Sequence, residues 1–243
     1  MRTVAIIQAR MGSTRLPGKV LQPIGDQTML ACVVTRARNA SAFGALVVAT
    51  TTEKADDAIV RECERLDVPS FRGNPDDVLD RYHAAARRHR ADEVVRITSD
   101  CPLLDPQVVD GVVGALHEDH ADYASNTVER TFPLGLDAEA LTSQALRTAW
   151  EQAKKPYERA HVTPYIWQHP DRFRIRQLKA EANFSDHRWT VDTREDLAFV
   201  RAVYARLHDP ERFGWRDVLE LVRADPSLED LNRHVRPKAL EEG

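Results

Sequence analysis

The sequence predicts an α/β fold in which helices flank a Rossmann-like, mostly parallel sheet. Short runs rich in Val and Ile alternate with stretches of helical periodicity along the first half of the chain, which is the pattern of βαβ units. The 243 residues are enough to bury a large core and fit one domain, residues 1–243, better than two. Because ligands bind at the carboxyl ends of parallel strands, we expect the loops that begin at Gln8, Thr50 and Ser99 to share one crevice.

The first half of the chain is expected to supply three strands and four helices. The strand segments are apolar and β-branched, whereas the helical segments carry apolar residues three or four positions apart. The fourth helix is defined by its start, since Asp105 suits the N-cap and Pro106 the first helical position, and its pattern runs to about Leu116. The elements expected before it are strands near 3–8, 45–50 and 93–98 and helices near 28–39, 53–66 and 76–90.

The pattern changes over about 127–185, which predicts an inserted subdomain. Within it we expect a strand around Leu136 to Leu141, helices near 143–154 and 157–168, and the basic strand "RFRIRQL". After it, "RWTV" predicts a short strand that rejoins the sheet, and a long amphipathic helix follows. The tail is expected to form short helices between its prolines, which are Pro210, Pro226 and Pro237.

The composition excludes several classes of protein. The chain has 34 basic and 38 acidic side chains and a formal charge of -4, so it lacks the excess of Lys and Arg that a general nucleic-acid binder uses. No segment approaches the roughly 18 apolar residues of a membrane helix, and no export signal is apparent. The three cysteines match no zinc spacing, so we expect reduced thiols and a cytoplasmic location; they are Cys32, Cys63 and Cys101.

The loop after the first strand, "QARMGSTRLPGK", is built to hold an anion. Gly12 and Gly18 let backbone N–H groups approach a ligand, while Arg10, Arg15 and Lys19 bring positive charge to the same place. Each cation at about 4 Å from a phosphate oxygen gains on the order of 4 kcal/mol near a protein surface, which suits a nucleoside triphosphate.

The same loop does not fit a P-loop NTPase. Five residues separate Gly12 from Gly18, and Val20 follows Lys19 where the Walker A motif needs Ser or Thr. The alternative to an anion site is a solvated basic turn.

A resemblance to a known family covers most of the chain, to about residue 205. "IIQARMGSTRLPGKVLQPIG" is similar to the nucleotide-binding signature of the cytidylyltransferases that make CMP-Kdo and CMP-sialic acid, and looks most like the SpsF-type spore coat polysaccharide branch. The segments "FRGNPDDVLDRY", "VRITSDCPLLDP", "ERAHVTPYIW" and "RWTVDTREDL" fit the same branch.

The resemblance implies a fold of the nucleotide-diphospho-sugar transferase type and a Mg²⁺-dependent activity. CMP would pass from CTP to a sugar, a sugar acid or another small acceptor, with release of pyrophosphate. A homodimer through the inserted segment is also implied.

The resemblance also assigns roles to residues. It implies catalytic roles for Arg10, Lys19, Asp100 and Asp192. It implies a nucleotide pocket formed by Gln8, Ala9, Arg10, Met11, Gly12, Ser13, Arg15, Lys19, Thr50, Arg72, Gly73, Asp77 and Ser99. For the segment around Asp77 the alternative is that residues 74–77 simply start the helix expected over 76–90, and both can be true.

Two aspartates are candidates for the metal. Asp100 follows the strand near 93–98 and Asp192 follows "RWTV", so both could reach one crevice and hold Mg²⁺, which prefers one or two carboxylates and several waters. By resemblance they match the metal-binding aspartates of the CMP-sugar synthetases. The alternatives are that Asp192 or Thr193 is a helix N-cap and that Asp100 forms a turn. Asp105 is assigned to capping.

The inserted segment supplies candidates for acceptor binding. Asp137 and Glu139 lie two apart on a probable strand and so point to one face, from which they could bond sugar hydroxyls. An exposed acidic face is the alternative. His161 matches a substrate contact of the Kdo enzymes by resemblance, and Tyr165 would lie one helical turn later; a buried, satisfied histidine is the alternative. Leu134 stands where the SpsF-like pattern is often acidic, so the acceptor stays open.

Two other functions remain candidates. A GT-A-like glycosyltransferase with a nucleotide-sugar donor would need an Asp-x-Asp motif, and the nearest match here is Asp137-Ala-Glu139. A binding or regulatory domain that has lost catalysis is the third, because a fold and a fingerprint do not fix function.

Overall fold

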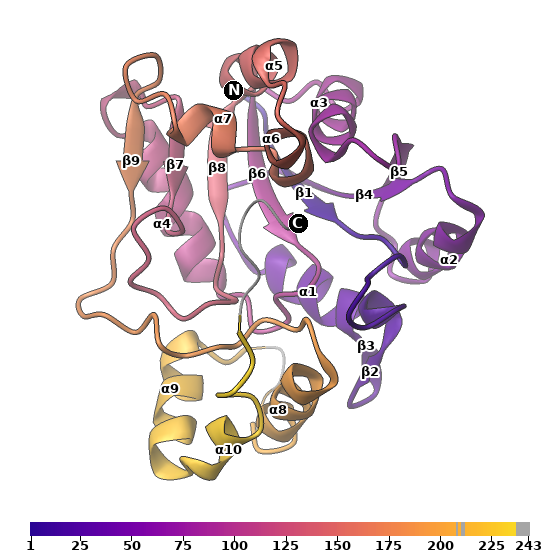
Figure 1. Cartoon of the computed structure of the whole chain (residues 1–243), viewed down its shortest axis with the longest axis vertical. Helices are drawn as coiled ribbons and strands as arrows, with labels where there is room; N and C mark the ends of the chain where they lie inside the picture. Colours follow the sequence, from indigo (N-terminus) through magenta and orange to yellow (C-terminus); the bar gives the residue numbers. More distant parts are fainter. Residues whose placement is uncertain (208, 210–211, 237–243) are drawn as a thin grey trace.

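The computed structural model describes residues 1–207, 209 and 212–236 (Figure 1). Within this part of the chain one seven-stranded sheet has the order β5-β4-β1-β6-β8-β7-β9, and β8 alone runs antiparallel to its neighbours. Its strands are β1 (Thr3–Gln8), β4 (Ala45–Thr51), β5 (Ser70–Gly73), β6 (Glu93–Thr98), β7 (Tyr123–Ser125), β8 (Glu139–Thr142) and β9 (Ile175–Gln177). A separate hairpin consists of β2 (Pro23–Ile24) and β3 (Gln27–Thr28).

Helices cover both faces of the sheet. The α-helices are α1 (Met29–Arg38), α2 (Asp57–Arg65), α3 (Val78–Arg88), α4 (Pro106–His117), α5 (Ser143–Gln152), α6 (Pro156–His161), α7 (Pro164–Trp167), α8 (Arg194–Tyr204), α9 (Trp215–Ala224) and α10 (Ser227–Asp230). Short 3₁₀ turns are η1 (Lys19–Leu21), η2 (Lys54–Asp56) and η3 (Glu118–His120).

Alternation along the strands divides the core in two. In β1, Ala5 and Ile7 pack with residues of α1, α4, α8 and α9, whereas Val4 and Ile6 pack with residues of α3, α5 and α7. Because successive side chains of a strand point to opposite faces, a strand that is apolar throughout must be covered on both sides. The apolar strand is therefore central, as the parallel fold requires.

The fold class predicted from the sequence is confirmed, and so are most elements of the first half. Strands 3–8 and 93–98 have the predicted limits, and the helix that starts at Pro106 is capped by Asp105, whose Oδ1 accepts from Gln107 N at 2.7 Å. The strand near 45–50 and the helix near 28–39 are also present. The segment near 53–66 opens with the η2 turn before α2 begins.

Several elements differ from the prediction. "RWTV" is not a strand: only an isolated bridge joins Arg188 to Leu134, because the segment leaves the sheet to enter the site. The helix expected over 157–168 is two helices, since Val162 has a φ of 74° and interrupts the hydrogen-bond pattern. The strand around Leu136 to Leu141 begins only at Glu139. β5, β7 and the β2–β3 hairpin were not predicted, as each is four residues or fewer.

Segment 127–185, predicted as an inserted subdomain, contributes β8 and β9 to the main sheet. Its role as a separate unit, and in a dimer, stays a prediction. The predicted tail helices correspond to α9 and α10, and Pro226 directly precedes α10. Pro210 and Pro237 lie outside the described residues.

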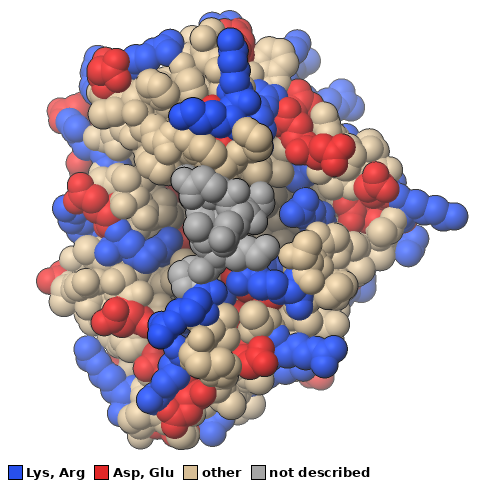
Figure 2. Space-filling view, viewed as in Figure 1, with Lys and Arg blue, Asp and Glu red and all other residues tan. Residues whose placement is uncertain are grey.

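On the face drawn in Figure 2, Lys and Arg side chains are intermingled with Asp and Glu, without a broad field of one sign. Among the described residues, every helix is too short or too polar to cross a membrane.

Candidate functional site

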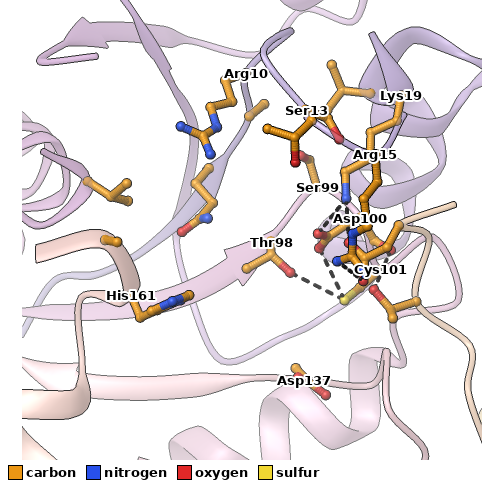
Figure 3. Close-up of a pocket in the computed structure, with 18 of the residues that line it drawn as sticks. Arg10, Ser13, Arg15, Lys19, Thr98, Ser99, Asp100, Cys101, Asp137 and His161 are labelled. Atoms are coloured by element: carbon orange, nitrogen blue, oxygen red, sulfur yellow. Dashed lines mark hydrogen bonds and ion pairs between the residues drawn. The ribbon is translucent and has the colours of Figure 1, made fainter. Parts of the chain in front are cut away.

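A cavity of about 750 Å³ opens at the carboxyl ends of β1 and β6. Its walls come from the loop after β1, the turn after β6, the start of α3, the end of α6 and the segment 188–192. In Figure 3, Lys19, Arg15 and Asp100 lie together on one side, His161 lies across the cavity, and Asp137 occupies another wall. The volume is typical of a small-molecule site.

The loop after β1 is held in place by buried polar contacts. Asp56 is 2% exposed, and its Oδ1 accepts from Met11 N at 2.8 Å while its Oδ2 accepts from Thr51 Oγ1 at 2.5 Å. Gly18 has a φ of 69°, a conformation that favours glycine, and its N donates to Met11 O at 2.9 Å. A Cβ added to Gly12 would meet no atom within 4 Å, so the space beside this glycine is open.

Lys19 joins the two aspartates that lie far apart in the sequence. Its Nζ donates to Asp100 Oδ2 at 3.0 Å, to Asp192 Oδ1 at 3.0 Å and to Val191 O at 2.7 Å (Figure 3). These three bonds use all the donors of the ammonium group. Burial by itself would lower the pKa of Lys19, but the two carboxylates outweigh burial and raise it above its usual value. Burial likewise opposes the charge of Asp100, whose pKa Lys19 holds below the ordinary value.

Two arginines complete this ion cluster. Arg15 and Arg188 each place an NH2 group 3.0 Å from Asp192 Oδ2. Arg188 also holds Asp196 with two bonds, of 2.8 and 2.9 Å. Asp196 in turn accepts from Asp192 N and Thr193 N at the start of α8. Three acids and three cations therefore balance one another.

The alternative reading of Asp192 as a helix cap is resolved by this geometry. Thr193 is the N-cap of α8, its Oγ1 accepts from Asp196 N, and Asp196 closes the capping box. Asp192 therefore has its carboxylate directed to the cavity, where it meets Lys19.

The carboxylate oxygens of Asp100 and Asp192 suit a hard divalent cation such as Mg²⁺. Asp100 and Asp192 present carboxylate oxygens to one point, and their side chains are 28% and 19% exposed to the cavity. Mg²⁺ binds through one or two carboxylates and completes its shell with water and phosphate oxygens. Within the described residues no cluster of three or more His, Cys, Asp and Glu has metal-binding geometry, so the chain offers this pair and not a closed cage.

The structure places some of the predicted nucleotide residues at the cavity and others away from it. Those that line it are Gln8, Ala9, Arg10, Ser13, Arg15, Lys19 and Ser99, whereas Met11, Gly12, Thr50, Arg72, Gly73 and Asp77 do not. Thr50 is fully buried. Arg72 bonds Asp57 at 2.6 Å and Thr51 O at 2.9 Å, and Asp77 caps α3 and accepts from Arg159 at 2.9 Å.

The predicted acceptor residues are also divided. Asp137 and His161 line the cavity; Glu139 and Tyr165 do not. Glu139 is 4% exposed and accepts from Arg96, from Tyr123 Oη at 2.5 Å and from Thr163 Oγ1 at 2.6 Å. The prediction that Asp137 and Glu139 point to one face of a strand was wrong, because β8 begins only at Glu139.

His161 and Tyr165 do not share one helical face. The break at Val162 places them on α6 and α7, and the hydroxyl of Tyr165 accepts from Arg172. The predicted spacing assumed an unbroken helix.

Sequence reasoning missed several residues that line the cavity. Arg96 had a detectable signal, because it interrupts an apolar strand of a parallel sheet, where a charged side chain is unusual. Arg188 gave a similar signal, because it is a charged residue in a segment predicted to be a strand. The other missed lining residues include Asp76, Val78, Arg81, Thr98 and Thr190.

Comparison with known proteins is consistent across sequence and structure. The sequence profile of the family described as Cytidylyltransferase matches residues 4–212. An uncharacterized protein of Methanocaldococcus jannaschii is 36% identical, over 100% of this chain and 99% of its own length. The spore coat polysaccharide biosynthesis protein SpsF of Bacillus subtilis is 33% identical over 91% of this chain and 94% of its own.

A solved structure is similar over nearly the whole chain. The structure of a cytidylyltransferase from Leptospira borgpetersenii superposes with a TM-score of 0.90 at 32% identity, and covers 98% of this chain and 100% of that one. Both the sheet and the segments that form the cavity therefore fall within the shared region.

Proposed function

This chain belongs to the cytidylyltransferase family and is a nucleotidyltransferase, and from that premise we propose that it transfers CMP from CTP to a small acceptor and releases pyrophosphate. The observation that carries the proposal is the meeting of Asp100 and Asp192 at Lys19, beside a loop rich in cations. The polysaccharide role in the name of the B. subtilis relative supports a sugar or sugar acid as the acceptor.

The triphosphate would lie along the loop after β1. Arg10 is exposed in the cavity and has no ion-pair partner among the described residues, so it can take a phosphate oxygen without breaking a contact. Lys19 and Arg15 are already paired with acids and would exchange these for phosphate oxygens. Backbone N–H groups near Gly12 would add donors.

Asp100 and Asp192 would hold Mg²⁺, which would neutralise charge on the α-phosphate and on the departing pyrophosphate. An acceptor oxygen would attack the α-phosphorus in line; the new bond is from oxygen to phosphorus, and the bond to the β-phosphate oxygen breaks. No side chain needs to act as nucleophile. Positioning and charge stabilisation by this chain's residues would supply most of the rate.

The acceptor would lie between Asp137 and His161, across the cavity from Lys19. Asp137 is oriented by Arg130, which bonds both of its carboxylate oxygens, at 2.5 and 2.8 Å. A carboxylate fixed in this way can accept hydrogen bonds from sugar hydroxyls.

A glycosyltransferase is disfavoured by the same contacts. The nearest match to an Asp-x-Asp motif is Asp137-Ala-Glu139, and Arg130 holds the first acid while Glu139 is buried against Arg96. Glu139 does not line the cavity, so the two acids do not meet there as the motif requires.

The first test is release of pyrophosphate from CTP with Mg²⁺ and a panel of sugar and sugar-acid acceptors. Lys19→Ala is expected to abolish turnover, because it removes the cation shared by the phosphate and metal contacts. Lys54→Ala, at an exposed lysine outside the cavity, serves as the control and is expected to retain activity. Full activity of Lys19→Ala, or release of UDP or GDP from nucleotide sugars in place of pyrophosphate, would contradict the proposal.

A further inference from the structure

The segment that carries Asp192 lies outside the strands of the sheet, so contacts other than a strand ladder must fix it. Residues 188–192 form no strand, and an isolated bridge joins Arg188 to Leu134. Val191 N donates to Asp100 O at 2.8 Å, which ties the segment to the turn after β6. Further contacts come from the C-terminal part of the chain.

Asn232, in the turn after α10, supplies two of these contacts. The residue is 2% exposed, and its Nδ2 donates to Arg188 O at 2.9 Å and to Asp196 Oδ1 at 3.0 Å. The amide group therefore uses both of its hydrogens on the segment and on the start of α8. Asn232 lies beyond the residues 4–212 that the family profile matches, so membership of the family does not by itself imply these contacts.

The two bonds hold Arg188 at both of its ends. The carbonyl of Arg188 accepts from Asn232, while its Nε and NH2 bond the two oxygens of Asp196, at 2.8 and 2.9 Å. Asp196 is fully buried, and its Oδ1 takes both Asn232 and the Nε of Arg188. The NH2 group also lies 3.0 Å from Asp192 Oδ2, so the position of Arg188 determines where one oxygen of Asp192 lies.

Packing by itself does not fix the side chain of Arg188. The residue lines both the cavity of the site and a second cavity, of about 310 Å³, so other side chains do not surround it completely. Its NH1 makes no hydrogen bond to the residues that the structure describes. The orientation of the guanidinium therefore depends on the hydrogen bonds to Asp196 and Asp192, and the first of these acids is held by Asn232.

The role of Arg188 grows when a nucleotide is bound. In the proposed function, Lys19 and Arg15 exchange Asp192 for phosphate oxygens, and Arg188 is the third cation that the structure pairs with this acid. Arg188 would then keep the carboxylate of Asp192 in place. Carboxylates that bind a metal are oriented by such outer contacts, and loss of one typically lowers metal affinity by about 10- to 100-fold.

We propose that Asn232 is a positioning residue for the metal, which holds Arg188 both directly and through Asp196 so that Asp192 keeps the orientation that binds Mg²⁺. The inference rests on the proposed function. Asn232 does not line the cavity of the site, so it touches neither the phosphates nor the metal. Its loss should therefore weaken the binding of Mg²⁺ and leave the binding of nucleotide without metal unchanged.

The test is calorimetric titration of CTP into the protein at Mg²⁺ concentrations from zero to saturation. In Asn232→Ala, the Mg²⁺ concentration that gives half of the full gain in CTP affinity is expected to rise by about tenfold. The affinity for CTP without Mg²⁺ should equal that of the wild-type protein. Asn232→Ser, which leaves a smaller space and keeps a hydroxyl donor, is measured in parallel and serves if the alanine variant does not fold.

Asn126→Ala is the matched control for lost stability. Asn126 is fully buried, its Nδ2 donates to Leu136 O at 2.8 Å, and its Oδ1 accepts from Ala138 N at 3.0 Å. These bonds involve neither Arg188 nor Asp196, so this variant should be less stable but should keep the Mg²⁺ dependence of the wild-type protein. An equal rise in the Asn126 and Asn232 variants would show that lost stability explains the effect, and would overturn the inference.

A double-mutant cycle tests the route through Arg188. Arg188→Lys keeps a cation near Asp192 but loses the paired bonds to Asp196, so Asn232→Ala should weaken Mg²⁺ binding much less in this background than in the wild-type protein. Additive effects would overturn the route.

Two outcomes separate this inference from the proposed function. Wild-type Mg²⁺ dependence in both Asn232 variants would overturn the inference and leave the proposed function intact. A wild-type protein whose affinity for CTP does not respond to Mg²⁺ would count against the proposed function itself.

Discussion

At the scale of single residues, Lys19 determines the state of the site. Its ammonium lies between the two carboxylates that are proposed to hold Mg²⁺. The ion cluster is electrically balanced before substrate arrives, so it avoids the destabilisation of two adjacent unpaired acids. A residue proposed to bind the nucleotide thus also stabilises the free protein.

His83 is expected to make the stability of the protein depend on pH. His83 is 7% exposed, stacks on Trp150 with ring centroids 4.3 Å apart, and has its pKa lowered from the usual 6.5, first by burial and then by Arg87. Below pH 6.5, His83 in the unfolded chain binds a proton more readily than His83 in the folded protein. The contribution of His83 to the free energy of unfolding is therefore complete above pH 6.5, and it is lost as the pH falls through the lower pKa of the folded state.

Melting temperatures between about pH 7.5 and 5.5 check this sign. The wild-type protein is expected to lose stability as the pH falls, and His83→Gln is expected to lose less. Equal slopes for the two proteins would show that His83 does not contribute.

At the scale of elements, one glycine positions the segment that carries Asp192. Gly135 has a φ of 113°, and a Cβ there would lie 2.5 Å from Thr190 N. Leu134 and Arg188 bridge at the same place. No side chain fits, so the close approach of these two segments depends on glycine.

Gly135→Ala is expected to destabilise the protein by about 3 kcal/mol, through overpacking and backbone strain together. It should also lower activity, since residues 188–192 must shift. Gly114→Ala is the matched control: it lies exposed in α4, its Cβ meets no atom within 4 Å, and it should gain about 0.5 to 1 kcal/mol. Denaturant unfolding measures both, and a neutral Gly135→Ala would contradict the packing argument.

The elements that could be predicted from the sequence are those with a long, regular pattern. β1, β6 and α4 show continuous apolar runs or a clear cap, and their limits were found. β5 and β7 are short, and their pairing is decided by strands distant in the sequence, which a local pattern cannot encode. The break between α6 and α7 depends on the conformation of one buried valine.

The residues of the site also divide into those that the sequence could predict and those that it could not. The closely spaced glycines and cations of one loop predicted that Arg10, Arg15 and Lys19 lie at the site. Asp100 and Asp192 were predicted to reach the same crevice because each follows a segment expected to be a strand. Contacts made by tertiary packing could not be read in advance: the burial of Glu139 on Arg96, and the presence of Arg81 at the wall, depend on how helices cover the sheet.

At the scale of the whole molecule, the ion cluster links the start of the chain to its last third. If Lys19 leaves the acids when the triphosphate binds, the metal and the nucleotide must assist each other, and the effect is reciprocal. In thermal-shift experiments, Mg²⁺ alone and CTP alone should each raise the melting temperature slightly, and the two together by more than the sum.

Lys19→Met provides the diagnostic variant. Without the ammonium, the two carboxylates should bind Mg²⁺ about tenfold more tightly in the absence of nucleotide, while affinity for CTP falls. Calorimetry with Mg²⁺ alone measures the first effect, and Lys54→Met is the control. Unchanged Mg²⁺ affinity in Lys19→Met would show that the lysine does not compete with the cation.

The dimer expected from the family resemblance is a prediction about this chain in solution. Light scattering should give twice the chain mass of 27.5 kDa. A mass of one chain would remove the predicted role of segment 127–185 in assembly.

The sharing of one lysine by two acids has an evolutionary consequence. A substitution at position 19 removes the cation beside Asp100, whereas Asp192 keeps Arg15 and Arg188. Across related sequences, positions 19 and 100 should therefore vary together, and lineages that have abandoned catalysis should have lost them as a pair.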